Sequence, residues 1–148
     1  MLWLLSACFL APAPPPALAP CTTLDALSVE DPWALPGTDE PGATDALRTR
    51  RLDRKPAWAS RCLVRRLGGL DVGPSCVAEG LSPAEADALY GRLVTAFEGC
   101  HEGWSLSDTS DAETREILAE RGPQLRFVRA RSLGERGWEV SIGAMPVL

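Results

Sequence analysis

The stretch from Leu81 to Trp104, LSPAEADALYGRLVTAFEGCHEGW, holds a complete signal for one amphipathic helix. Ser82, followed three residues later by Glu85, forms a capping box, and Pro83 stands at the first helical position, where its missing N–H costs nothing. The apolar residues that follow recur at spacings of three and four and define one buried stripe: Ala86, Leu89, Tyr90, Leu93, Phe97 and Cys100. This pattern predicts a core helix that ends near Gly99, and it indicates no chemistry by itself.

Four short segments on either side of this helix have the composition of β-strands. Arg61 to Leu67 and Ser75 to Glu79 flank the turn-forming pair Gly68-Gly69, which predicts a hairpin. Leu125 to Arg131 and Trp138 to Ala144 predict a second strand pair, and in the last segment apolar and polar residues alternate. The sequence therefore predicts two strands before the helix and two near the end of the chain.

A second capping pattern lies between the main helix and the last strands. Ser110 is followed three residues later by Glu113, and Gly122-Pro123 supplies a stop signal. This pattern predicts a short, mostly polar helix at the rim of the domain. The expected order is thus strand, strand, helix, short helix, strand, strand, and the fold class is α+β: a small antiparallel sheet with one main amphipathic helix on one face.

The 148-residue chain has the length and composition of one small domain with additions at its N-terminus. We expect residues 61–148 to form the α+β domain. Residues 21–60 contain prolines at 32, 36, 41 and 56 and read as a Pro-rich linker or arm, although its large apolar residues suggest that parts of it dock. Residues 1–20 are expected to be an export signal or a lipoprotein leader.

Two export routes fit this leader. The apolar run from Leu2 to Leu10 is too short for a membrane span and about right for a signal core, and Ala17-Leu18-Ala19 fits a cleavage site. Leu5 to Cys8, LSAC, instead resembles a lipobox with Cys8 as the lipidated residue. No other stretch predicts a membrane span, so we expect a mature chain without one, located in the periplasm, at the cell envelope or outside the cell.

The cysteines support this location. Five are present, and four remain if Cys8 is removed or lipidated, which is an even number that suits two disulfides. These four allow three connectivities. The predicted hairpin places Cys62 opposite Cys76 at a distance that a disulfide spans, so we favour this bridge together with Cys21–Cys100.

The charges suggest one candidate binding surface. The net charge of -5 makes nucleic acid an unexpected partner. Four arginines cluster in and around the final strand pair: Arg126, Arg129, Arg131 and Arg136. If these side chains converge, they form a surface for an anionic envelope component or an acidic protein. The alternative is a solvated face neutralised by Glu135, Glu139 and the acidic residues between positions 25 and 45.

Catalytic and metal-binding patterns are weak. Cys100 and His101 are neighbours at a helix end and rarely face each other, so His101 is better explained as a cation-capable cap on the helix C-terminus. The cysteine spacing does not suit zinc, and the acidic run from Asp108 to Glu113 lacks the spacing of a calcium-binding loop. We therefore expect no catalytic residue, no metal and no cofactor.

The order of cysteine, helix, Cys100-x-x-Gly103-Trp104 and two strands resembles small exported bacterial proteins to which no activity is assigned. The resemblance covers at most the last two thirds of the chain, and the strong preference for arginine over lysine also suggests a bacterial source. The expected function is non-enzymatic binding at the envelope or outside the cell. The alternative is a small secreted enzyme or enzyme inhibitor, which a deep cleft with convergent titratable groups would favour.

Overall fold

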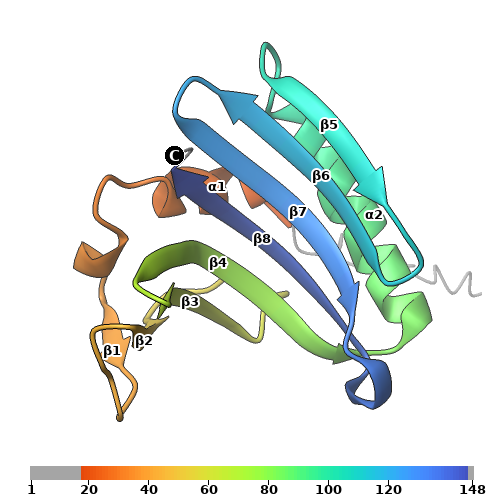
Figure 1. Cartoon of the computed structure of the whole chain (residues 1–148). Coiled ribbons are helices and arrows are strands. Elements are labelled where there is room, and N and C mark those ends of the chain that lie inside the picture. The colour runs from red at the N-terminus through yellow and green to blue at the C-terminus, as the bar shows by residue number, and fades with distance from the viewer. Residues whose placement is uncertain (1–17, 147–148) are drawn as a thin grey trace, which may run out of the picture.

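The main helix lies on one face of an eight-stranded antiparallel sheet in the computed structural model, which describes residues 18–146 (Figure 1). A second, shorter helix lies on the same face, beside the C-terminal end of the first. The fold is therefore an α+β fold in which, among the described residues, strand outweighs helix.

The sequence signals around the main helix, α2 (Pro83–Gly99), are confirmed. The backbone N–H of Glu85 donates to the Ser82 hydroxyl over 3.1 Å, and the Ser82 N–H donates to the Glu85 carboxylate over 3.0 Å. The buried positions of the helix recur at spacings of three and four, as its stripe predicts: Ala86, Tyr90, Leu93 and Phe97.

Helix α2 connects the middle of the sheet to its edge. The strands lie in the order β1-β2-β3-β4-β8-β7-β6-β5, so α2 carries the chain from β4 to β5, and the following meander returns until β8 pairs with β4. The strands on this path are β3 (Arg61–Leu67), β4 (Leu70–Leu81), β5 (Ser105–Ser110), β6 (Thr114–Arg121), β7 (Gln124–Ser132) and β8 (Trp138–Pro146). The four strands predicted from the sequence are β3, β4, β7 and β8.

The short helix predicted from Ser110 onward is wrong, because this segment forms the β5–β6 hairpin. The carboxylate of Asp111 accepts hydrogen bonds from the backbone N–H groups of Glu113 and Thr114, at 2.8 and 2.7 Å, and so builds a turn where a helix start was expected. Ile117 and Ala119 in β6 are then buried at a period of two, which is the period of a strand.

The segment interpreted as a linker adds further elements to the same fold. It forms α1 (Pro20–Leu27), a 3-10 helix (Pro32–Ala34), β1 (Gly37–Asp39) and β2 (Leu47–Leu52). The expectation of a small sheet with one helix is therefore wrong. The prolines of this segment stand at the boundaries of the short elements, where they interrupt no ladder.

The core lies between the helices and the sheet. Leu24 of α1 and Leu93 and Phe97 of α2 are all 0% exposed. They pack on the helix-facing side chains of the strands, which include Val64, Ala119, Val128, Val140 and Ile142. Helix α1 therefore belongs to the core rather than to an arm attached to it.

Two disulfides lie within residues 18–146, and they join the expected pairs. Cys62 and Cys76 face each other across β3 and β4 with their Cα atoms 4.0 Å apart. Cys21 in α1 is joined to Cys100 at the end of α2, with a Cα separation of 6.0 Å. Two such bridges indicate an oxidising setting such as the periplasm or the extracellular space.

The sequence makes two predictions about membranes, one on spanning helices and one on a leader. Among the helices of residues 18–146, none is long and apolar enough to cross a membrane. The proposed leader and its lipidation candidate Cys8 lie outside the described residues, apart from the last few positions of the leader.

Leu93→Asp should unfold the domain, because it places a carboxylate with no partner at a fully buried position of α2. The expected cost is several kcal/mol against a total stability of about 5–15 kcal/mol. Thermal denaturation followed by circular dichroism measures it. Arg92→Asp, on the exposed side of the same helix, is the matched control and should change the melting temperature little. An unchanged melting curve for Leu93→Asp would show that the buried face is assigned wrongly.

Candidate functional site

The four arginines proposed as a binding surface do not converge. Arg126 lies on the helix-facing side of β7 and is 8% exposed. Arg129 and Arg131 share the parity of Phe127 and lie on the opposite face of the sheet. Arg136 lies apart from them, in the 3-10 helix between β7 and β8 (Gly134–Arg136).

Three of these arginines are ion-paired within the chain. The guanidinium of Arg126 is 2.9 Å from the carboxylate of Asp25 in α1. The corresponding distances are 2.5 Å from Arg129 to Glu116 and 2.6 Å from Arg131 to Glu139. These pairs agree with the alternative in which acidic residues, including the N-terminal ones, neutralise the arginines.

His101 lies in a buried network beside α1 and is 2% exposed. Its Nδ1 lies 2.6 Å from the carbonyl oxygen of Phe97, to which it donates, and Nη1 of Arg126 donates to its Nε2 over 3.4 Å. Both contacts suit a neutral ring. Burial lowers the pKa of His101, and the nearby charge of Arg126 lowers it further, against the opposing effect of the Phe97 hydrogen bond.

The role expected for His101 therefore needs correction. The ring does satisfy a carbonyl at the end of α2, but as a neutral donor and not as a cation. Cys100 is held in a disulfide, so a thiol–imidazole pair is not available. Trp104 packs edge-to-face on His101, with ring centroids 4.8 Å apart, and covers the network.

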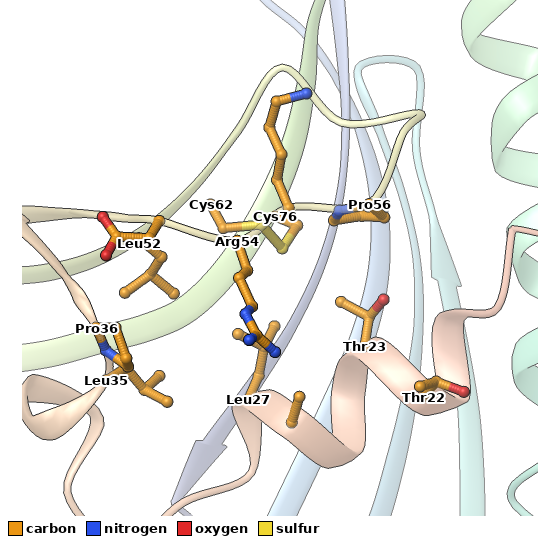
Figure 2. A pocket seen from close by; sticks show the side chains of 13 residues that line it. Thr22, Thr23, Leu27, Leu35, Pro36, Leu52, Arg54, Pro56, Cys62 and Cys76 are labelled. Carbon is orange, nitrogen blue, oxygen red and sulfur yellow. A yellow bond between two sulfur atoms is a disulfide. The ribbon is translucent and has the colours of Figure 1, made fainter.

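A pocket of about 650 Å³ lies between α1 and the β2–β4 half of the sheet (Figure 2). One wall is a face of α1, and the opposite side is formed by the end of β2 and the residues that follow it. The lining residues are Thr22, Thr23, Ala26, Leu27, Leu35, Pro36, Leu52, Asp53, Arg54, Lys55, Pro56, Cys62 and Cys76.

The pocket combines apolar walls with a polar rim. Leu27 and Leu52 are buried, and the Cys62–Cys76 disulfide forms part of the wall between them. The side chain of Arg54 extends past this disulfide toward Leu27 (Figure 2). Lys55 donates from Nζ to the carbonyl oxygen of Ala59 over 2.9 Å.

Arg54 differs from most arginines of this protein in its surroundings. Among residues 18–146 no hydrogen bond or ion pair engages its guanidinium, whereas Arg126, Arg129 and Arg131 are each paired with an acid. Asp53 is the acidic residue in the lining, next to Arg54 and Lys55. The formal charge of these three neighbours is therefore +1.

Sequence reasoning missed this pocket because most of its residues belong to the segment interpreted as a linker. The one available signal was the number of large apolar residues there, such as Leu27 and Leu35, which exceed what a solvated tether needs. No periodicity indicated that they would face the Cys62–Cys76 hairpin. Within the described part of the chain, no group of three or more side chains suited to a metal ion lies together.

The neutral state of His101 predicts a pH dependence of stability. Because folding lowers the pKa of the ring from its ordinary value of 6.5, its contribution is complete above that pH and is lost as the pH falls toward the lower folded pKa. The unfolding free energy should therefore decrease on acidification from about pH 7.5 to about pH 5.5.

Urea denaturation of His101→Gln tests the source of this slope. The variant should lose less stability than the wild type over the same pH interval, even if it is less stable at every pH. Equal slopes in the two proteins would assign the pH dependence to other groups.

Comparisons of the chain with models of protein families, with curated proteins and with solved structures found no significant match.

Proposed function

We propose that this protein is an exported, non-enzymatic binding protein that holds a small apolar ligand in the pocket between α1 and the β2–β4 half of the sheet. The observation that carries the proposal is the pocket itself. Its volume of about 650 Å³ lies in the range typical of small-molecule sites, and its walls are largely apolar with a few polar groups at the rim.

Binding fits the site better than catalysis does. Catalytic sites usually gather groups whose pKa values are strongly shifted. In the described part of this chain the groups with shifted pKa values lie outside the pocket lining: Asp39, Arg50, Arg66, Asp71, Tyr90 and His101. The alternative of a small secreted enzyme or enzyme inhibitor gains no comparable support.

Ion pairing explains these shifts near the N-terminal strands. Hydrogen bonds from Arg50 and Arg48 lower the pKa of Asp39 to about 2, and Arg66 likewise lowers the pKa of Asp71. The guanidinium of Arg48 lies over the indole of Trp33, with its carbon 4.2 Å from the ring centroid. The indole N–H of Trp33 donates a hydrogen bond to the carboxylate of Asp71. These contacts dock the N-terminal segment on β2 and β4, which is a structural role.

Two observations support the exported setting. The Cys21–Cys100 and Cys62–Cys76 disulfides suit an oxidising compartment. The apolar start of the sequence suits an export signal or a lipoprotein leader. The arginine surface predicted to bind an anionic envelope component or an acidic protein gains little support, because Arg126, Arg129 and Arg131 are ion-paired within the chain.

Ala26→Trp should abolish binding of a neutral apolar probe. Ala26 is exposed on the pocket side of α1, so an indole there fills the pocket without removing a core residue. The probe is N-phenyl-1-naphthylamine, whose fluorescence rises in an apolar site, and linear alcohols should displace it from the wild type. Their affinity should increase about threefold to fourfold per added methylene.

Glu98→Trp is the control, since it adds an indole at an exposed position of α2 away from the pocket lining. It should bind the probe as the wild type does. If the wild type does not bind the probe, or if Ala26→Trp binds it equally well, the pocket is not the binding site.

A further inference from the structure

We infer that the pocket selects a single alkyl chain that ends in a carboxylate, with the chain between α1 and the sheet and the carboxylate at Arg54. This inference rests on the proposed function and adds the class of ligand to it. Its basis is the position of one guanidinium at the rim of an apolar pocket.

Charge complementarity at the rim favours an anion. Arg54 and Lys55 are two cations beside one acid, Asp53, and the guanidinium of Arg54 has no acidic partner among residues 18–146. A guanidinium presents two parallel N–H groups that match the two oxygens of a carboxylate. An anionic group at this position would complete a pair of the kind that the arginines of β7 already have.

The hydroxyl group of Thr22 on α1 adds a further donor on the other side of the rim. Thr22 and Thr23 both line the pocket and lie on α1, across from the segment that carries Arg54 (Figure 2). Thr23 Oγ1 lies 3.4 Å from the Ala19 carbonyl oxygen, whereas Thr22 is exposed. Because the Thr23 hydroxyl donates to Ala19, a head group between Thr22 and Arg54 would be contacted by one donor group from each wall.

The apolar surface limits the tail to one chain. The buried walls consist mainly of Leu27 and Leu52, with Leu35 and the Cys62–Cys76 bridge beside them. A pocket of about 650 Å³ is of middle size among small-molecule sites, and a lipid with two acyl chains would leave one of them in water. Arg54 is an exposed residue, so the water around its charge is replaced only in part.

Competition for N-phenyl-1-naphthylamine between decanoate, 1-decanol, decylammonium and decyl phosphate tests the inference on the full chain with both disulfides formed. Decanoate should bind most tightly, and its affinity should fall as the salt concentration rises, while that of 1-decanol should not fall. Arg54→Gln should weaken decanoate about tenfold and leave 1-decanol unchanged.

Arg51→Gln is the matched control, because Arg51 is an exposed arginine of β2 outside the pocket lining. It should bind decanoate as the wild type does. Equal affinities for decanoate and 1-decanol, or an unchanged decanoate affinity in Arg54→Gln, would overturn the inference and leave the proposed function standing. Stronger binding of decylammonium or decyl phosphate would overturn it as well. Failure of all four compounds to displace the probe would overturn the inference, and failure of the probe itself to bind would overturn the proposed function too.

Discussion

The bridge between Cys21 and Cys100 is the constraint on which the arrangement of this protein depends. It joins residues that are 79 positions apart and fixes α1 beside the end of α2. In the chain-entropy model a loop of this length contributes about 4.5 kcal/mol to stability. The network of Asp25, Arg126 and His101 lies next to the bridge and ties α1 to β7 and α2. Covalent and polar contacts therefore act on the same short helix.

The position of α1 determines both the core and the pocket. Leu24 on one side of the helix is fully buried against α2 and the sheet, whereas Thr22, Thr23 and Ala26 face the pocket. An eight-residue helix is too short to be stable by itself in water, so tertiary contacts and the bridge must hold it in place. The proposed ligand site thus exists because a marginal helix is fixed to a stable one.

The sequence predicts local structure well where one residue pattern has one physical meaning. The capping box at Ser82 and the stripe of α2 are observed, and Gly68-Gly69, with φ values of 59° and 81°, makes the turn between β3 and β4. The helix predicted from Ser110 is wrong, because the carboxylate of Asp111 accepts hydrogen bonds from the backbone N–H groups of Glu113 and Thr114 and forms a turn. The pocket was not predictable, since its walls come from α1 and β2, whose meeting depends on long-range contacts. The candidate arginines were identified from the sequence together with the alternative that acidic residues neutralise them, and the ion pairs support that alternative. Their separation was not predicted: strand parity places Arg126 on the opposite face of the sheet from Arg129 and Arg131.

Peptide mapping of the unreduced protein by mass spectrometry tests the central constraint most directly. The account predicts one linked peptide pair that contains Cys21 and Cys100 and a second that contains Cys62 and Cys76. A linkage between Cys76 and Cys100, or four free thiols in protein recovered from its native compartment, would contradict it. Either result would remove the covalent link that fixes α1, one wall of the proposed binding site, beside α2.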